Sequence, residues 1–380
     1  MSKAIYAMSA DPITFGHLDI IKRASIIFDE LVVGIGVNPS KNYLFSLEER
    51  TYLTRQALSK LNNVEVKSFQ GLLVDFAYES GADAIVKGVR NPTDFAYETN
   101  LLRLGDSQDL GIDTMLLIAN PKLAHVSSSA VKQIQKEQGL IHEYVPLNVK
   151  QALEEKISSQ HIVIVTGEIG VGKSYVSEQF CQLGEKMGLE VHNIELDNLT
   201  HQIYQELPQA KYKQIRNTIA DNFGQELKNE DGSIDRQGLG EIVFDDYEKL
   251  TELNEIMKQP LLVRIRRELY GKKGLILLNA ALVIETEMTY LANNNVCLIK
   301  ADKEIQKQRL MQRDLDQRQI ERRIGSQYNF TKKKSYMKKM IERDQFGHIW
   351  TLDNSIENKQ DNIKAVFSQM LDYFKLKSKN

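Results

Sequence analysis

The chain has 380 residues, of which 42% are hydrophobic and 26% charged, and its formal net charge is −2. This composition is typical of a soluble chain with material for two globular domains, and the near-zero charge excludes the global positive field that nucleic-acid binding needs. The two cysteines, Cys181 and Cys297, form no CxxC pair, so we expect two reduced thiols in a cytoplasmic protein. The strand-like start leaves no room for a signal peptide, and the longest apolar stretch (275–284) is too short for a membrane span.

In chain order, the first part of the sequence alternates strand-like and helix-like segments. Strands are predicted at 5–7, 31–37, 64–66, 84–86 and 115–118, and helices at 16–28, 46–57, 72–79 and 129–137. The sequence Ser46-Leu-Glu-Glu49 is a capping box, which predicts a helix start at this point. The alternation indicates an α/β fold with a doubly wound parallel sheet. Ligands of such sheets bind beyond the carboxyl ends of the strands.

A polar stretch at 155–160 interrupts this pattern, and a second series of strands and helices begins after it. We therefore predict two domains, at 1–157 and 158–380. In the second domain, strands are predicted at 161–165, 191–194, 275–278 and 296–299, a helix at 175–184, and mainly helices from Lys303 onward. Here too the pattern favours a doubly wound parallel sheet.

The turn after the first strand, Thr14-Phe-Gly16-His17, opens a helix and places an imidazole beside its N-terminus. Both groups are suited to hold an α-phosphate oxygen while charge builds on it. Far along the chain, Ser127-Ser-Ser129 offers hydroxyls for phosphates at another helix start. The alternatives are a surface histidine in an ordinary turn and serines that only cap a helix.

Three basic residues, Lys41, Lys87 and Arg90, are each expected just past a strand end. Any one of them has an alternative interpretation as a solvated surface charge. Three at the predicted ligand edge together indicate a site for anionic groups.

In the second domain, Gly167-Glu-Ile-Gly-Val-Gly-Lys173-Ser174 fits the pattern G-x-x-x-x-G-K-[ST] and lies between a strand and a helix. The glycines allow backbone N–H groups to surround phosphates, and Lys173 reaches the β- and γ-phosphates. The Ser174 hydroxyl is the expected ligand of Mg²⁺. The segment therefore predicts binding of a nucleoside triphosphate, and ATP with Mg²⁺ is expected.

Two further segments bear on phosphoryl transfer. Glu195-Leu-Asp197 follows the next predicted strand, where an acid can accept the proton of an acceptor hydroxyl; the alternative for Asp197 is a helix N-cap. Arg309 and Arg313 share a helical face. They are either solvated charges or cations for the transferred phosphoryl group.

Taken together, residues 161–375 resemble the dephospho-coenzyme A kinases. The resemblance rests on the P-loop, Glu195-Leu-Asp197, Gly232-x-Ile234-Asp235-Arg236, 253–260, Arg309…Arg313-Asp314 and Asp353-Asn354. It implies that Asp197 acts on a ribose 3′-hydroxyl, with Lys173 at the phosphates. The ATP contacts expected from the loop and the resemblance are Gly167, Gly170, Val171, Gly172, Lys173, Ser174, Tyr175, Arg309 and Arg313. The sequence departs from the family at Glu168 (a P-loop glycine), Gln259 (a histidine) and Ala281 (a proline).

Residues 3–153 resemble the bacterial-type phosphopantetheine adenylyltransferases. The matching segments are Asp11-Pro-Ile-Thr-x-Gly-His17, Pro39-Ser-Lys41, 45–50, 63–66, Gly88-Val-Arg90, 94–98, Ser127-Ser-Ser129-x-Val-Lys132 and 144–146. The resemblance implies that His17 stabilises the transition state, that Ser9, Lys41, Leu73 and Lys87 contact phosphopantetheine, and that Ala10, His17, Gly88, Val89, Arg90, Glu98, Ser127, Ser128 and Ser129 line the ATP site. Met8 and Ala10 depart from the family's first loop, where Met8 replaces a glycine, and Lys87 replaces an arginine.

The two resemblances imply consecutive steps of one pathway, so a bifunctional enzyme is expected. Its substrates and products are ATP, 4′-phosphopantetheine, dephospho-CoA and CoA. A homo-oligomer formed through the first domain is implied by relatives of that domain. Two alternatives stay open: the first domain uses another phosphate acceptor, such as nicotinamide mononucleotide, or it is an inactive docking module beside an active kinase.

Overall fold

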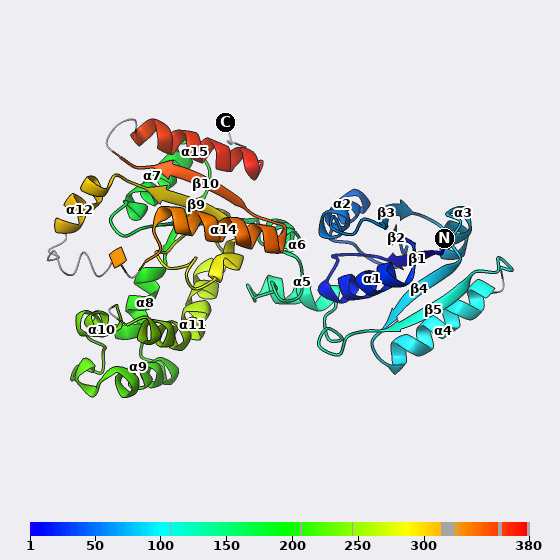
Figure 1. The fold of residues 1–380 in the computed structure, drawn as a ribbon, viewed down its shortest axis with the longest axis horizontal. Helices are drawn as coiled ribbons and strands as arrows, with labels where there is room; N and C mark the ends of the chain where they lie inside the picture. Colours follow the sequence, from blue (N-terminus) through cyan, green and yellow to red (C-terminus); the bar gives the residue numbers. More distant parts are fainter. Residues whose placement is uncertain are drawn as a thin grey trace. The chain divides into compact units, whose positions relative to one another are not determined.

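The computed structural model describes residues 1–106, 108–205, 207–244, 246–312, 324–325, 327–355 and 359–377. The chain divides into two compact units, Met1–Ile157 and Ser158–Asn380, and each is described by itself (Figure 1). Among the described residues, no helix combines the length and the apolar character that crossing a membrane requires.

The N-terminal unit is built on a parallel sheet of five strands in the order β3-β2-β1-β4-β5. The strands are β1 (Lys3–Met8), β2 (Glu30–Gly36), β3 (Val64–Phe69), β4 (Ala84–Val89) and β5 (Asp113–Ile118). The helices are α1 (Phe15–Ile27), α2 (Leu47–Ala57), α3 (Leu73–Glu79), α4 (Pro92–Asp106), α5 (Ser128–Lys136) and α6 (Leu147–Leu153), with one π-helical turn, η1 (Glu154–Ser158). The predicted doubly wound parallel sheet is confirmed; α4 and α6 were not expected.

The two faces of this sheet bury alternate residues of its strands, as the period of two requires. Tyr6 and Val33 face a large core formed with α1, α2 and α5. Ile5 and Val32 face a smaller core with Ala77 of α3. The predicted capping box is confirmed, because Ser46 Oγ accepts the Glu49 N–H and Glu49 Oε2 accepts the Ser46 N–H.

The C-terminal unit contains a second parallel sheet of five strands, in the order β10-β9-β6-β8-β7. The strands are β6 (Gln160–Gly167), β7 (Val191–Glu195), β8 (Gly274–Asn279), β9 (Asn295–Lys300) and β10 (His348–Asp353). The helices are α7 (Lys173–Lys186), α8 (Leu196–Gln205), α9 (Ala210–Phe223), α10 (Arg236–Val243), α11 (Tyr247–Leu269), α12 (Lys303–Met311), α14 (Phe330–Asp344) and α15 (Lys359–Tyr373), with 3₁₀ turns η2 (Gln225–Leu227) and η3 (Met288–Ala292).

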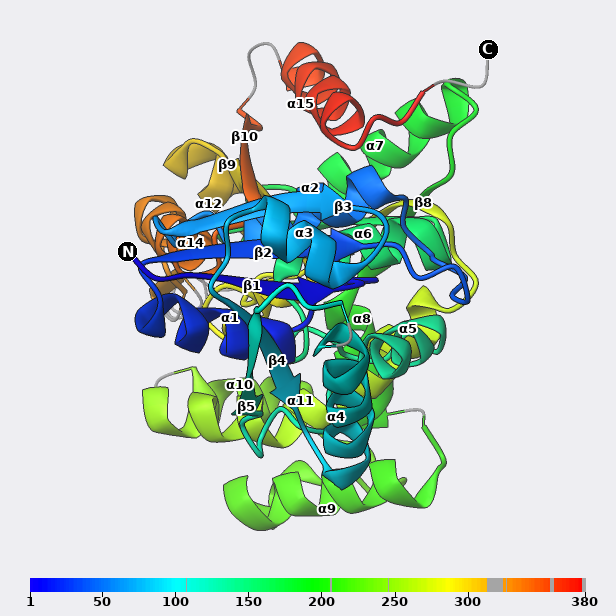
Figure 2. The ribbon, with the colours of Figure 1, turned by 90° about the vertical axis from the view of Figure 1, so that its right-hand side faces the viewer.

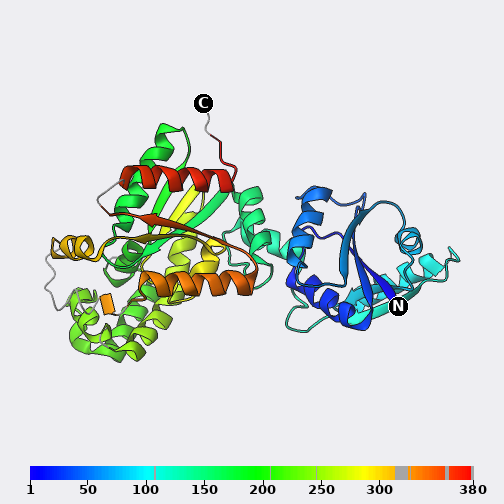
Figure 3. The ribbon, with the colours of Figure 1, turned by 45° about the horizontal axis from the view of Figure 1, so that its top comes forward.

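The expectation of mainly helices after Lys303 missed β10. This strand lies at the sheet edge, and only Trp350 and Leu352 of its six residues are buried. Such a short, half-polar segment carries little local strand signal. Figure 3 shows β10 between α15 on one side and α14 on the other.

Helices α8 to α11 gather away from the sheet and form their own core, which includes Ile203, Ile219 and Leu239. Figures 1 and 2 both show α9 and α10 at the end of the unit opposite to α15. Residues at or just after the carboxyl ends of β6, β7 and β8 line a cavity together with residues of α8, α10 and α11.

Gly184 lies where α7 packs closely against β7. A Cβ atom at this position would collide with Cγ2 of Val191 in β7. We therefore expect Gly184→Ala to overpack this contact and to lower the free energy of unfolding by about 1–3 kcal/mol. The measurement is denaturant unfolding followed by Trp350 fluorescence, since the chain's single tryptophan lies in this unit. Adding Val191→Ala should restore part of the loss; an unaltered midpoint for Gly184→Ala alone would contradict the overpacking.

Candidate active sites

His17 lies in the first turn of α1, directly after the loop that leaves β1. Its Nδ1 accepts the Thr14 backbone N–H at 3.1 Å and lies 3.0 Å from Thr14 Oγ1. Because Nδ1 is an acceptor, the neutral ring carries its proton on Nε2. Burial, with the nearby charges of Arg90 and Lys41, lowers the pKa of His17 to about 4. At neutral pH the side chain is therefore an uncharged N–H donor.

The buried carboxylate of Asp11 joins three segments of the same site. It accepts the backbone N–H groups of Leu44 and Phe45 at 3.0–3.1 Å. Its Oδ2 also forms an ion pair with Lys132 of α5, at 2.6 Å. These contacts bring together the loop of His17, the loop that precedes α2 and the helix that follows the serines.

The three serines lie at the N-terminus of α5. Ser127 Oγ accepts the Ala130 N–H at 3.2 Å, so it caps the helix, as one sequence interpretation proposed. Ser128 Oγ donates to the carbonyl of Pro12 at 2.8 Å, and Ser129 is exposed. The serines are thus held beside the His17 loop, and phosphate binding by them stays a prediction.

Two of the predicted binding residues are paired with each other. Lys87 Nζ lies 3.0 Å from Glu98 of α4, and both side chains are mostly buried. Arg90 forms an ion pair with Asp94 at 2.8 Å. The expectation that Lys87 lies past a strand end is wrong, because β4 continues to Val89.

The structure of the first loop shows why a methionine is tolerated at position 8, where the family has glycine. Met8 is the last residue of β1 and pairs with Ile35 in regular register. It therefore needs no left-handed backbone, and a side chain fits where the family has glycine. Ala10 instead has a φ of 50° and is buried.

The remaining predicted residues of this unit lie close to the same edge. The Ser9 carbonyl accepts Arg50 Nη1 at 2.6 Å, and Leu73 begins α3. Lys41 is exposed in the loop after β2. At Gly88 a Cβ would lie 2.9 Å from Cγ1 of Ile20, so α1 packs directly against β4.

In the C-terminal unit, the phosphate-binding loop joins β6 to α7 as predicted. Gly170 and Gly172 have φ values of 81° and 90°, which disfavour other residues. A Cβ at Gly172 would collide with Asn354 Nδ2. Lys173 Nζ donates to the carbonyls of Gly167 and Glu168 at 3.4 and 3.1 Å. Lys173 is thus folded onto its own loop.

Side chains from α12 and from the residue that follows β10 hold the backbone of this loop. Arg309 donates to the carbonyls of Val171 and Asn354 at 3.0 and 2.9 Å. Asn354 Nδ2 also donates to Val171, at 2.7 Å, and Gln306 Nε2 donates to Ile169 at 2.5 Å. Arg309 therefore binds the backbone of the loop. Sequence reasoning missed Gln306, because a helical glutamine carries no local signal.

Two further predicted ATP contacts have different outcomes. Tyr175 of α7 is partly buried against the core of this unit, with Lys359 Nζ 3.7 Å from the centre of its ring. Arg313 lies outside the residues that the structure describes.

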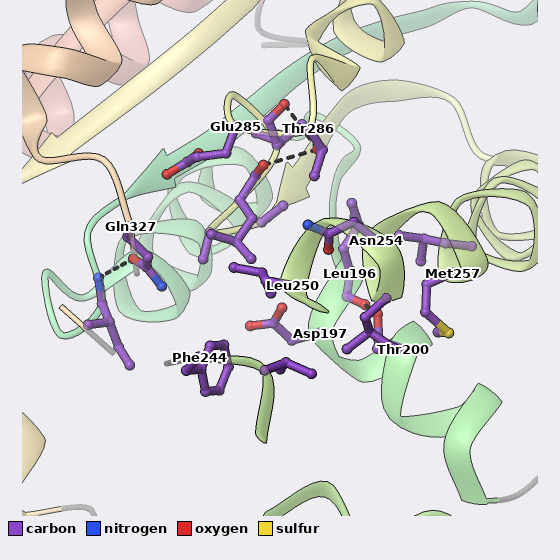
Figure 4. Close-up of a pocket in the computed structure, with 18 of the residues that line it drawn as sticks. Leu196, Asp197, Thr200, Phe244, Leu250, Asn254, Met257, Glu285, Thr286 and Gln327 are labelled. Carbon is purple, nitrogen blue, oxygen red and sulfur yellow. Dashed lines mark hydrogen bonds between the residues drawn. The ribbon is translucent and has the colours of Figure 1, made fainter. Parts of the chain in front are cut away.

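A cavity of about 1250 Å³ extends from the phosphate-binding loop toward α10 and α11 (Figure 4). Lys173 and Ser174 line one end, and Leu250, Phe244 and Met257 line the helical end. Asp197 also lines it (Figure 4). The N-cap interpretation of Asp197 is wrong, since α8 begins at Leu196 and Asp197 lies within its first turn.

Glu285, which lines the cavity, belongs to a buried ion pair that the sequence did not suggest. Lys333 is fully buried, and its Nζ lies 2.7 Å from Glu285 Oε1 and donates to the Ala281 carbonyl at 2.7 Å. In the sequence it belongs to a run of three lysines, which is usually a solvated surface. The Ala281 position contributes its backbone to this contact, so the contact does not depend on the proline that the family has there.

Comparison with known proteins assigns the two units separately. The family model described as Dephospho-CoA kinase matches residues 161–346, and the model described as Cytidylyltransferase-like matches residues 5–134. A phosphopantetheine adenylyltransferase of Clostridium perfringens is 43% identical over 159 residues, covering 42% of this chain and 97% of the relative. Those of Limosilactobacillus reuteri and Clostridium novyi are 39% and 44% identical, covering 43% and 41% of this chain and 95% and 98% of the relatives.

The environment of His17 gives a direct prediction about its ionisation. With a folded-state pKa of about 4 and an ordinary value near 6.5, His17 should stay neutral between pH 5 and 8. The folded protein then binds fewer protons at this site than the unfolded chain, so His17 should reduce stability as the pH falls from 6.5 to 4. The measurement is an NMR titration of the imidazole ¹⁵N shifts, with His17→Gln to assign the signals. A midpoint near 6.5 would contradict the buried, Thr14-bonded geometry.

Proposed function

The N-terminal part of the chain belongs to the phosphopantetheine adenylyltransferase family and its C-terminal part is a dephospho-CoA kinase domain, and from this premise we propose that one polypeptide catalyses the last two steps of coenzyme A biosynthesis. In the first step, ATP and 4′-phosphopantetheine give dephospho-CoA and diphosphate. In the second, ATP phosphorylates the 3′-hydroxyl of dephospho-CoA. The observation that carries the proposal is that one chain contains both domains, and that the product of the first reaction is the substrate of the second.

In the adenylyl transfer, a 4′-phosphate oxygen forms a bond to the α-phosphorus of ATP, and the bond from that phosphorus to the bridging oxygen breaks as diphosphate leaves. The Nε2–H of neutral His17 is suited to donate to an α-phosphate oxygen as its charge grows. Lys41 and Lys87 are the expected cations for the incoming phosphate. Lys87 must exchange its Glu98 partner for that phosphate, so binding replaces one ion pair with another.

In the phosphoryl transfer, the 3′-hydroxyl oxygen attacks the γ-phosphorus, and ADP leaves as the bond to the β,γ-bridging oxygen breaks. Asp197, one of the carboxylates that line the cavity, is proposed to accept the hydroxyl proton. Lys173 needs to exchange the carbonyls of Gly167 and Glu168 for phosphate oxygens. The hydrogen bonds from Gln306, Arg309 and Asn354 keep the loop in place while this exchange happens.

Mg²⁺ fits this site as a companion of ATP. The described residues contain no cluster of three His, Cys, Asp or Glu side chains that could hold a metal by itself. In phosphate-binding loops of this pattern the Ser or Thr after the lysine takes part in holding Mg²⁺, and the hydroxyl of Ser174, which lines the cavity, is the proposed protein ligand. When bound, the ion neutralises charge on the β- and γ-phosphates. A cytoplasmic location and assembly through the N-terminal unit stay predictions.

The function is tested by the products that purified protein forms from 4′-phosphopantetheine, ATP and Mg²⁺. We expect wild type to yield CoA, and Lys173→Ala to stop at dephospho-CoA because its phosphate-binding loop lacks the lysine. His17→Ala should form little of either product, since it lacks the donor to the α-phosphate. Each variant serves as the folding control for the other unit: His17→Ala should still phosphorylate supplied dephospho-CoA. If wild type phosphorylates dephospho-CoA but leaves 4′-phosphopantetheine unchanged, the adenylyltransferase half of the proposal fails.

Asp197 allows a sharper test of the second step. Asp197→Asn keeps the shape of the side chain but cannot accept a proton, so we expect kcat of the kinase to fall by about 10²- to 10⁴-fold. The KM for ATP should change little, because the phosphate-binding loop is untouched. Adenylyl transfer by the same variant provides the control. Full kinase activity in Asp197→Asn would remove this residue from catalysis.

A further inference from the structure

Glu168 stands in the phosphate-binding loop where the kinases that this sequence resembles have a glycine, and its side chain has a distant partner. Its Oε1 accepts the backbone N–H of Phe330 at 2.8 Å. Phe330 is the first residue of α14, and the first N–H groups of a helix have no partner within it. The carboxylate therefore satisfies such a group and lies at the positive end of the helix dipole.

The next residue of the loop reaches the same segment. The backbone N–H of Ile169 donates to Gln327 Oε1 at 3.0 Å, a bond that is drawn in Figure 4. Two consecutive loop residues thus hold Gln327 and Phe330, which are separated by only two residues. The phosphate-binding loop and the start of α14 form one hydrogen-bonded unit.

The opposite side of this segment is held by the buried ion pair. Tyr328 donates its backbone N–H to Glu285 Oε1 at 2.9 Å, and Glu285 is paired with the buried Lys333. Burial lowers the pKa of the Lys333 ammonium, while the carboxylates of Glu285 and Glu168 oppose this shift. The segment 327–333 is therefore fixed from two directions.

Gln327 and Tyr328 both line the cavity that contains Asp197. Tyr247, at the start of α11, lines the same cavity. The phosphate-binding loop itself has separate support from Gln306 and Arg309. Loss of the Glu168 bond should therefore loosen the segment that contains Gln327 and Tyr328 more than it loosens the phosphate-binding loop.

We propose that Glu168 is a positioning residue of the kinase site, which through Phe330 fixes Gln327 and Tyr328 as the wall of the acceptor-binding part of the cavity. The identification of the acceptor as dephospho-CoA rests on the proposed function. The glycine that the family has at this position cannot make this bond. The loop of this chain thus holds the start of α14 through a side chain, which a glycine at position 168 does not provide.

The test compares Glu168→Ala with Glu168→Gln, which retains an acceptor oxygen, and with Glu185→Ala, an exposed glutamate of α7, as the matched control. We expect Glu168→Ala to raise the KM for dephospho-CoA by about fivefold to tenfold, as the loss of one hydrogen bond implies. The KM for ATP should stay within about twofold of wild type. Glu168→Gln and Glu185→Ala should behave as wild type for both substrates.

A second readout needs no acceptor. Hydrogen–deuterium exchange of peptides covering 327–333 should be faster in Glu168→Ala than in wild type, and unchanged in Glu185→Ala. If wild type does not phosphorylate dephospho-CoA, the proposed function fails, while the exchange result still decides the role of Glu168.

Several results would overturn the positioning role. These are unchanged exchange and KM in Glu168→Ala, an equal rise in the KM for ATP, and a defect in Glu168→Gln as large as in Glu168→Ala. If Trp350 fluorescence indicates that Glu168→Ala unfolds, Gln327→Ala replaces it, because that variant removes the neighbouring bond to Ile169. It should raise the KM for dephospho-CoA selectively, and a wild-type KM would overturn the proposal.

Discussion

The loops that leave the carboxyl ends of a parallel sheet lie outside the strand ladder, so side chains from other segments must hold their backbone groups. In the N-terminal unit the carboxylate of Asp11 has this role. It binds two backbone N–H groups before α2 and the ammonium of Lys132. A buried carboxylate is tolerated only when it is paired and hydrogen-bonded, and here those partners come from separate segments. The relative placement of His17, Lys41 and the serines depends on this arrangement.

In the C-terminal unit, the backbone carbonyls of the phosphate-binding loop are likewise held by side chains, here by neutral and cationic donors. Arg309 and Asn354 both donate to the Val171 carbonyl, and Gln306 donates to that of Ile169. These bonds leave the inner face of the loop, with Lys173 and Ser174, open to the cavity. The loop backbone is therefore held by side chains of the protein itself.

Several cations that we propose to bind phosphate have partners within the protein. Lys87 is paired with Glu98, Arg90 with Asp94, and Lys173 rests on loop carbonyls. Under the proposed function, a phosphate replaces these partners when it binds. This arrangement agrees with a net charge of only −2. It also shows why charge counting along the sequence cannot locate such sites: Lys87 and Arg90 are each paired with a nearby carboxylate.

The sequence by itself determined both parallel sheets, the capping box, the phosphate-binding loop and the two family resemblances, because these depend on local periodicity and on contiguous motifs. It did not determine the ion pair of Asp11 with Lys132 or the bond of Glu168 to Phe330, whose partners are 121 and 162 positions apart. It also placed Lys87 past a strand end and missed β10, an edge strand with two buried residues. Lys333, in a run of lysines that resembles a solvated surface, is buried only because α14 packs against the sheet beside Glu285. Burial and pairing are properties of the assembled chain, since a side chain's neighbours are set by which segments the fold brings together.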